Sequence, residues 1–284
     1  MSRSRTDIVL IWSLRGCAAL AGAIVLLIVV FLVLESLPAL QHVGLARFFT
    51  DASWQPSEGL YNLTPMLWGT LFAMAGAVLV ATPLGVLSAM FCHYYAAPVV
   101  ARFYRRLIEL LAGIPSVVYG LWGLVVLVPL IGSLHPPGPS LLAGIAILTI
   151  MILPTIALMA DAALANVPAH YLRGASALGL SRWATIRGVV FPAAKSGLFT
   201  GVILETGRAI GETMAVLMVC GNVVQTPANV FEPIRTLTAN IALEMAYALG
   251  DHRAALFVSG LVLMAVIVVL VAGAERISKG RVYG

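Results

Sequence analysis

Three charged side chains lie within eight residues of one apolar stretch, and their types could bind an anion. The stretch reads LETGRAIGETMAV (204–216) and contains Glu205, Arg208 and Glu212. On a helix, spacings of three and four residues place all three on one face, so Arg208 could reach both carboxylates. An arginine at the centre of a membrane helix costs about 2.5–3.5 kcal/mol on insertion scales. This face is therefore expected to look into the helix bundle or a water-filled pathway, and not at lipid.

Two roles for Arg208 are compatible with this spacing. In the first, a buried ion pair fixes the orientation of the helix. In the second, the planar guanidinium binds a phosphate-like oxyanion in a bidentate way, and Glu212 holds the arginine in place or competes with the anion so that it can leave. Ionisable residues inside a membrane are functional-site candidates by default, which favours the second role. The substrate-pathway residues are then Arg208, Glu212 and Glu205.

A second motif lies in the long basic loop 164–195. Its sequence predicts a helix over about 167–178, a sharp turn at Gly179, and a second helix that ends near Pro192. Glycine supplies the backbone freedom for such a turn, and the next membrane helix cannot extend backwards through a proline intact. A compact element of this kind suits docking into a groove on a partner, although an unoccupied surface helix would have the same composition.

The elements that position these motifs are membrane helices. The chain has 284 residues, of which 61% are hydrophobic and 10% charged, with a mean hydropathy of +1.00. Soluble domains carry roughly 25% charged residues, and apolar runs of about 20 residues span a bilayer. We therefore expect an all-α, polytopic membrane protein with six helices, at roughly 13–37, 64–92, 107–131, 141–163, 196–220 and 254–274. Residues 1–63 form a first helix and external loop, and residues 64–284 a five-helix unit.

The charge pattern predicts the topology. Thirteen of the 17 Lys and Arg residues fall in the two termini and the loops 93–106 and 164–195, which alternate with the apolar runs. Under the positive-inside rule these segments, and both termini, are cytoplasmic. The net charge of +5 is thus a topology signal and does not indicate nucleic-acid binding. In the external segment 221–253, the stretch 228–250 is expected to be either a short helix at the outer face or an ordered loop.

No residues suggest catalysis, a metal or a cofactor. Three cysteines and five histidines are scattered without ligand-like spacing. The nearest approach to a phosphate-binding loop, GVVFPAAKS (188–196), lacks the second glycine and the required spacing. The chain is therefore not expected to be an enzyme, and energy for any active process must come from a partner.

The long loop resembles the EAA loop of bacterial ABC importers. Ala175, Gly179 and Pro192 match its register, whereas Arg173 stands where that family has glutamate and Gly174 replaces its first alanine. In the family this loop forms the coupling helix that rests on an ATP-binding subunit. The resemblance thus implies that these five residues belong to an ATPase-coupling element.

Three further stretches carry a narrower resemblance. LLAGIPSVVYGLWGL (110–124), GRAIGETMAVLMVCGN (207–222) and PIRTLTANIALEMAYA (233–248) are similar to the PstC-type permease subunits of bacterial phosphate ABC importers, which have the MetI-like fold. This implies a multi-pass inner-membrane subunit with a PstA-like sister permease, two ATP-binding subunits and a periplasmic phosphate-binding protein. It also implies that Arg208 and Glu212 take part in the passage of inorganic phosphate.

Several alternatives remain open. The chain could be a PstA-type sister subunit, or a permease for sulfate or molybdate. From different classes, it could be an ATP-independent ion-coupled transporter or channel, or a scaffold in which Arg208 is only structural. The run RAIGET favours phosphate, and the long loop argues against a carrier without an ATPase, because such a carrier needs no docking element there.

Overall fold

Six helices in the structure are long and apolar enough to cross a membrane. The structure is a computed structural model that describes residues 5–279. The six candidate spans are Val9–His42, Thr64–Tyr94, Ser116–Leu134, Leu141–Ala165, Arg182–Gly211 and Gly250–Ala274. The prediction of an all-α, six-helix membrane protein is confirmed, and four of the six predicted spans are matched over nearly their whole length.

Shorter elements connect and interrupt these spans. The helices are α1 (Arg5–His42), α2 (Arg47–Thr50), α3 (Thr64–Tyr94), α4 (Pro98–Ala112), α5 (Ser116–Trp122), α6 (Val128–Leu134), α7 (Leu141–Ala165), α8 (Ala169–Ala177), α9 (Arg182–Thr185), α10 (Phe191–Gly211), α11 (Met214–Val219), α12 (Leu237–Glu244) and α13 (Gly250–Lys279). Two short strands, β1 (Trp54–Gln55) and β2 (Leu60–Tyr61), pair antiparallel. Two π-helical segments cover Gly123–Leu127 and Ile186–Val190.

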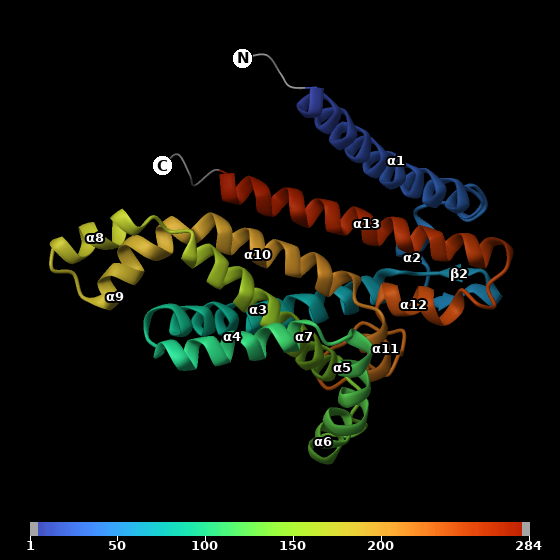
Figure 1. Ribbon diagram of the computed structural model, residues 1–284. Coiled ribbons are helices and arrows are strands. Elements are labelled where there is room, and N and C mark those ends of the chain that lie inside the picture. Colours follow the sequence, from blue (N-terminus) through green and yellow to red (C-terminus); the bar gives the residue numbers. More distant parts are fainter. Residues whose placement is uncertain (1–4, 280–284) are drawn as a thin grey trace.

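The centre of the bundle is α7, which packs closely against α3 and α10 (Figure 1). Its core side chains include Ile147, Met151 and Ile152, each with at most 1% of its surface exposed. Glycines let α3 approach α7: a Cβ added to Gly85 would lie 2.7 Å from a side-chain atom of Ile156. Small residues at helix contacts permit this close packing in membranes. The helix α1 lies at the edge of the bundle against α13.

The third span is shorter than predicted. Instead of one helix over 107–131, the chain forms α4, a break at Gly113–Pro115, and a new helix from Ser116. Proline has no N–H and disfavours helical geometry in the residue before it, which explains the break. The predicted loop 93–106 is therefore largely helical, and Arg105 of α4 pairs with Asp161 of α7 at 3.0 Å.

The helix before Pro192 does not end there, which corrects the prediction. The chain is helical from Arg182 to Gly211, and the turn just before the proline widens into the π-helical segment Ile186–Val190. A wider turn removes the clash between the proline ring and the preceding carbonyl groups and tolerates its missing N–H. Pro129 is accommodated in the same way by the π-helical segment Gly123–Leu127. Proline here widens the helix and does not stop it.

The fifth span is broken, contrary to the predicted continuous helix 196–220. The helix α10 ends at Gly211, Glu212 has extended backbone geometry (φ −66°, ψ 127°), and α11 begins at Met214. Glycine costs about 1 kcal/mol relative to alanine inside a helix, so Gly211 weakens the helix at this point. The charged motif therefore straddles two helices.

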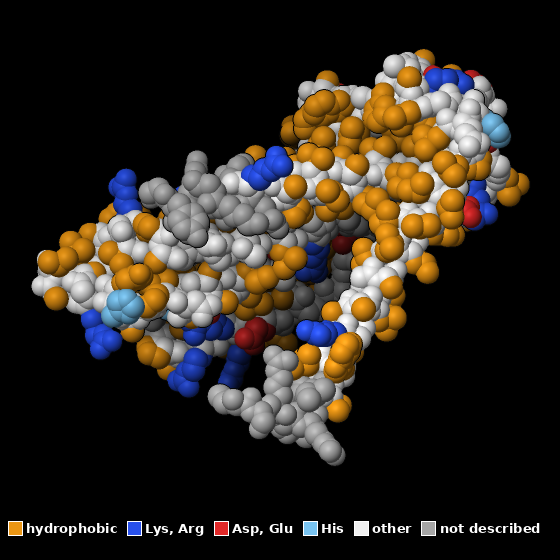
Figure 2. Space-filling model, turned by 90° about the horizontal axis from the view of Figure 1, so that it is seen from above, with side chains coloured by type: hydrophobic (Ala, Val, Ile, Leu, Met, Phe, Trp, Pro, Cys, Tyr) orange, Lys and Arg blue, Asp and Glu red, His pale blue; other side chains and the backbone are white. Residues whose placement is uncertain are grey.

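The two ends of the bundle differ in construction (Figure 1). One end carries α8 and α9, the helices of the long basic loop. The other carries α2, the two strands and α12. The helix α12 confirms the first of the two alternatives for the stretch 228–250, a short helix. Hydrophobic side chains cover much of the molecular surface, and Figure 2 shows a hollow that contains basic and acidic side chains.

Candidate anion pathway and coupling loop

One exposed stripe runs along α10 and carries Arg208. The stripe consists of exposed residues spaced three or four positions apart, from the N-terminal to the C-terminal end of the helix: Ala193, Gly197, Thr200, Leu204, Arg208 and Gly211. Five of these six residues are small or polar. By contrast, α1 exposes large apolar residues such as Val25, Leu26 and Leu27. Lipid-facing surfaces are apolar, so the α10 stripe fits a water-filled or protein-covered surface better than a lipid-exposed one.

Arg208 is available for an anion. Its side chain is 38% exposed, and its nearest charged partner is Glu205, at 3.8 Å between Nη1 and Oε2. This separation is too long for a hydrogen bond, and Arg208 donates none to the residues that the structure describes. The guanidinium fork therefore keeps its donors free for an oxyanion, which it matches in a bidentate way.

Glu205 is the buried partner of this arginine. Only 5% of its surface is exposed, and its Oε2 atom lacks a hydrogen-bond partner within the described part of the chain. A buried carboxylate oxygen without a partner carries a desolvation cost. Arg208 reduces this cost only in part, because its guanidinium lies 3.8 Å from the carboxylate oxygen.

Glu212 is not on the face of Arg208, so the prediction that Arg208 reaches both carboxylates is wrong. The break after Gly211 turns Glu212 towards α11, where its Oε1 accepts a hydrogen bond from the N–H of Ala215 at 3.1 Å. A carboxylate at this position satisfies a free N–H at a helix start. The backbone carbonyl of Glu212 accepts a second bond, from Thr238 Oγ1 at 2.9 Å. Glu212 therefore fixes the turn that ends the Arg208 helix.

The end of the bundle that carries α2, the two strands and α12 contains a carboxylate network that the sequence analysis missed. Glu244 is 7% exposed and accepts hydrogen bonds from Trp54 Nε1 at 2.9 Å and Arg235 Nη1 at 2.7 Å. His252 Nε2 lies 2.8 Å from the same carboxylate. These partners come from the loop between α2 and α3, the segment before α12 and the start of α13. The sequence carries no local signal for this network, because Trp54 lies 190 residues from Glu244.

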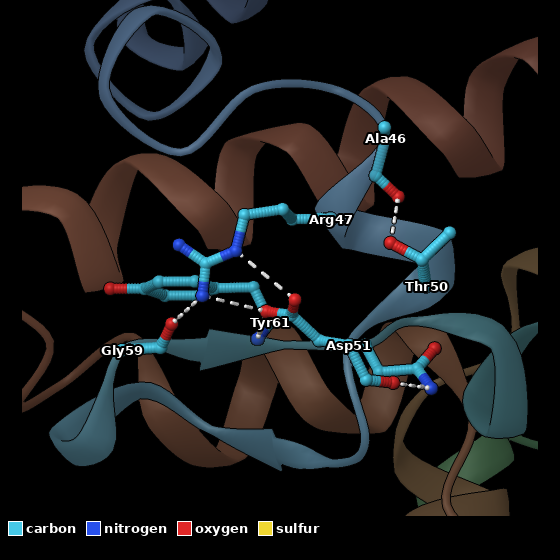
Figure 3. Close-up of polar contacts among 7 residues, drawn as sticks. Ala46, Arg47, Thr50, Asp51, Gly59 and Tyr61 are labelled. Carbon is cyan, nitrogen blue, oxygen red and sulfur yellow. Dashed lines mark hydrogen bonds and ion pairs between the residues drawn. The ribbon is translucent and has the colours of Figure 1, made fainter.

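A second polar cluster closes the loop between α2 and α3 (Figure 3). Arg47 contacts both carboxylate oxygens of Asp51 at 3.1 Å and donates to the Gly59 carbonyl at 2.6 Å. The N–H of Tyr61 also donates to Asp51, at 2.9 Å. Burial alone would raise the pKa of Asp51, but the bonds from Tyr61 and Arg47 outweigh it and hold that pKa below its ordinary value. This cluster and the Glu244 network tie this end of the bundle together by polar contacts.

Four of the five predicted coupling-loop residues lie at or next to α8, at the opposite end of the bundle. Gly179 has a φ of +71°, the left-handed geometry that glycine adopts at the end of a helix, which confirms the predicted turn. Ala175 is buried beneath this turn, where its carbonyl accepts the N–H of Leu180 at 3.1 Å. Arg173 and Gly174 lie on α8, and Pro192 lies in the first turn of α10, further along the continuous helix.

The tip of this loop exposes apolar side chains that the sequence analysis did not single out. Leu178 is 80% exposed and Trp183 is 57% exposed. Both flank the turn at Gly179, and the hydroxyl of Ser181 caps α9 between them by accepting the N–H of Ala184 at 3.2 Å. Exposed apolar residues on a polar, basic element are typical of a contact surface for another protein.

Comparison with protein families gives one match over most of the chain. The family model described as binding-protein-dependent transport system inner membrane component matches residues 81–282. The probable ABC transporter permease protein YqgH of Bacillus subtilis is 40% identical over 82% of this chain and 77% of that protein. The phosphate transport system permease protein PstC of Mesorhizobium japonicum is 34% identical over 94% of this chain and 88% of that protein.

Solved structures support the same fold. A chain of a bacterial alginate ABC transporter, solved with an alginate-bound periplasmic protein, aligns with a TM-score of 0.67 over 98% of this chain and 97% of that chain, at 16% identity. A chain of the MetNI methionine ABC transporter in inward-facing conformations aligns with a TM-score of 0.63 over 77% of this chain and 95% of that chain, at 19% identity. At these identities the likeness concerns the fold alone.

Proposed function

Because the chain belongs to the family of binding-protein-dependent transport system inner membrane components, we propose that it is a permease subunit of an ATP-driven importer of inorganic phosphate. It is a multi-pass membrane subunit without catalytic activity, and ATP hydrolysis belongs to a partner ATPase. The observation that carries the phosphate assignment is Arg208, an exposed arginine inside a membrane span whose donors are free. Curated relatives named as phosphate permeases support the same substrate.

The partners follow from this proposal. The subunit pairs with a PstA-like sister permease in the bacterial inner membrane, above two ATP-binding subunits and below a periplasmic phosphate-binding protein. Residues 64–284 form the transport unit, with the coupling loop at 164–195. Residues 1–63 supply an accessory helix and the outer loop. The family match, which begins at residue 81, and the position of α1 at the edge of the bundle agree with this division.

In this scheme Arg208 binds phosphate as it crosses the membrane, close to the point where α10 ends. Glu205 is the counter-charge to which the guanidinium returns, and it competes with the anion so that binding stays reversible. Glu212 positions the end of the helix that carries Arg208 through its bonds to α11 and Thr238. The exposed stripe from Arg208 down to Ala193 lines the path towards the cytoplasm.

Reconstitution tests the substrate and the energy source. The complex of both permeases and the ATPase, placed in vesicles with the binding protein, is expected to accumulate labelled phosphate only when ATP is present. Unlabelled sulfate and molybdate are expected to leave uptake unchanged at equal concentration. Full competition by either anion would identify a different oxyanion permease, and uptake without the ATPase would identify an ATP-independent carrier.

The coupling loop makes a separate prediction. Replacing Gly179 with valine forces a β-branched residue into left-handed geometry, which costs on the order of 1–3 kcal/mol and should distort the turn between α8 and α9. Co-purification of the ATPase subunit is expected to fall severalfold. Gly22→Val, in α1 with free space around it and outside the coupling loop, is the matched control and should co-purify normally. Unchanged co-purification of the Gly179→Val complex would remove the coupling assignment.

A further inference from the structure

An apolar cavity lies between α3 and the helix that runs from Arg182 to Gly211. Its volume is about 520 Å³. The α3 side contributes residues from Thr82 to Met90, and the other side contributes apolar side chains from Phe191 to Val202. Trp183 and Arg187 line the end nearest the coupling loop. The cavity is open to the side, because Leu87 and Phe191 on its rim are 59% and 44% exposed.

The length of the apolar part matches one leaflet of a bilayer. From Phe191 to Val202 the helix rises about 16 Å, at 1.5 Å per residue. The hydrocarbon core of a membrane is about 30 Å thick, so the groove reaches from one surface to the middle. A membrane helix from another subunit would need a groove along the whole span, about 20 residues long. An acyl chain from one leaflet needs only half of it.

The end near the coupling loop has the chemistry of a headgroup site. Arg187 is exposed and forms no ion pair with the residues that the structure describes. Trp183, one helical turn before it, is 57% exposed. Tryptophan concentrates at the level of lipid headgroups, and basic pockets between membrane helices on the cytoplasmic side bind anionic headgroups.

From this geometry we infer that the groove binds an anionic phospholipid of the inner leaflet, with one acyl chain between α3 and α10 and its phosphate on Arg187. Only the assignment to the inner leaflet rests on the proposed orientation. The site is separate from Arg208, which lies on the exposed stripe of α10 and does not line the groove. A bound lipid there would brace the helix that joins the coupling loop to the anion pathway.

The test is lipid retention by the intact complex. The complex is exchanged into nanodiscs of equal parts phosphatidylglycerol and phosphatidylcholine, without substrate or ATP. It is then released from the nanodiscs, and the lipids that remain bound are identified by native mass spectrometry. The wild type is expected to retain phosphatidylglycerol preferentially. Arg187→Gln should reduce this preference about fivefold, the effect of one basic residue at a membrane surface. Leu87→Trp, on the rim, should reduce retention of both lipids.

A matched control removes the same charge nearby. Arg182 lies in the same helix but lines a neighbouring cavity with Tyr94 and Leu180, so Arg182→Gln should retain phosphatidylglycerol like the wild type. Equal retention by the wild type, Arg187→Gln and Leu87→Trp would overturn the inference. A disulfide cross-link between a Leu87→Cys variant and a single cysteine introduced at successive positions of the sister permease would also overturn it, because that subunit would then occupy the groove. Normal phosphate uptake together with either result would show that this inference alone had failed.

Discussion

The molecule contains two buried glutamates that face an arginine, and they are satisfied to very different degrees. Glu244, at the end of the bundle that carries α12, accepts hydrogen bonds from Trp54 and Arg235 and lies 2.8 Å from His252. Glu205, near the C-terminal end of α10, has Arg208 at 3.8 Å and an oxygen with no hydrogen-bond partner among the described residues. Their exposures are nearly equal, at 7% and 5%.

This difference is what we expect between a structural site and the proposed functional one. A buried charge is tolerated when its hydrogen bonds are complete, and the Glu244 network then fixes three segments relative to one another. A buried ion pair whose hydrogen bonds are incomplete costs free energy in the folded protein. Such a cost persists mainly where the charged group has a function. The Arg235–Glu244 pair thus holds together the end of the bundle that carries α12. For the Arg208–Glu205 pair we propose that the arginine exchanges the glutamate for an anion.

The largest stability effect should come from Glu244. Glu244→Gln leaves Arg235 without its counter-charge, and breaking a buried pair in this way costs about 3–5 kcal/mol. Glu205→Gln should cost about 1 kcal/mol or less, because its ion pair is long and the side chain of its arginine is 38% exposed. Thermal unfolding of the purified complex measures both. Glu58→Gln, at an exposed position of the loop between α2 and α3, controls for loss of a surface charge. Equal destabilisation by Glu244→Gln and Glu205→Gln would contradict the proposed difference between the two glutamates.

A smaller effect should appear where the two regions meet. Thr238→Val keeps the side-chain shape but removes the bond from Thr238 Oγ1 to the Glu212 carbonyl. It also removes the 3.1 Å contact between the hydroxyls of Thr238 and Thr236, and loss of each neutral hydrogen bond costs about 0.5–1.5 kcal/mol. Because the bond to Glu212 fixes the turn after Arg208, phosphate uptake should fall severalfold although the complex remains assembled. Thr50→Val, which removes the bond from the Thr50 hydroxyl to the Ala46 carbonyl, should leave uptake unchanged. A Thr238→Val complex with full uptake would show that α12 does not position the turn.

The smallest effect concerns acid and the loop between α2 and α3. The folded-state pKa of Asp51 lies below the ordinary value of an aspartate, because its bonds from Tyr61 and Arg47 outweigh the opposing effect of burial. A depressed pKa contributes stability above the unfolded-state value, and this contribution disappears as the pH falls through the folded-state value. The difference in unfolding temperature between the wild type and Asp51→Asn should therefore be present at pH 7 and shrink as the pH falls below the ordinary pKa of an aspartate. A difference that is independent of pH would contradict the charge-based role of this cluster.

Much of the architecture is predictable from the sequence because it depends on local properties. Runs of about 20 apolar residues predict the spans, and Gly179 predicts the turn between α8 and α9 because only its backbone adopts left-handed geometry easily. The exposed Arg208 was also found in this way, since an arginine inside an apolar stretch is conspicuous. The conclusion that it pairs with Glu205 needed only a spacing of three residues.

The errors arose where distant contacts decide local structure. The break at Glu212 depends on its own bond to Ala215 and on Thr238, which lies 26 residues away. A helical projection assumes continuity and therefore placed Glu212 beside Arg208. The Glu244 network is assembled from three segments, so no local pattern announces it. At Pro192 the helix widened instead of ending, an outcome that depends on the packing of buried Ile186 and Val190 against the bundle.

The central claim is that Arg208 binds the transported anion and contributes little to the fold, and one measurement tests it most directly. Phosphate uptake and thermal unfolding are recorded on the same reconstituted complex carrying Arg208→Gln. We expect uptake to fall by about 100-fold or more, the scale of losing a principal oxyanion donor, while the unfolding temperature and subunit composition stay at wild-type values. Wild-type uptake, or a loss of uptake accompanied by unfolding or disassembly of the complex, would contradict the account.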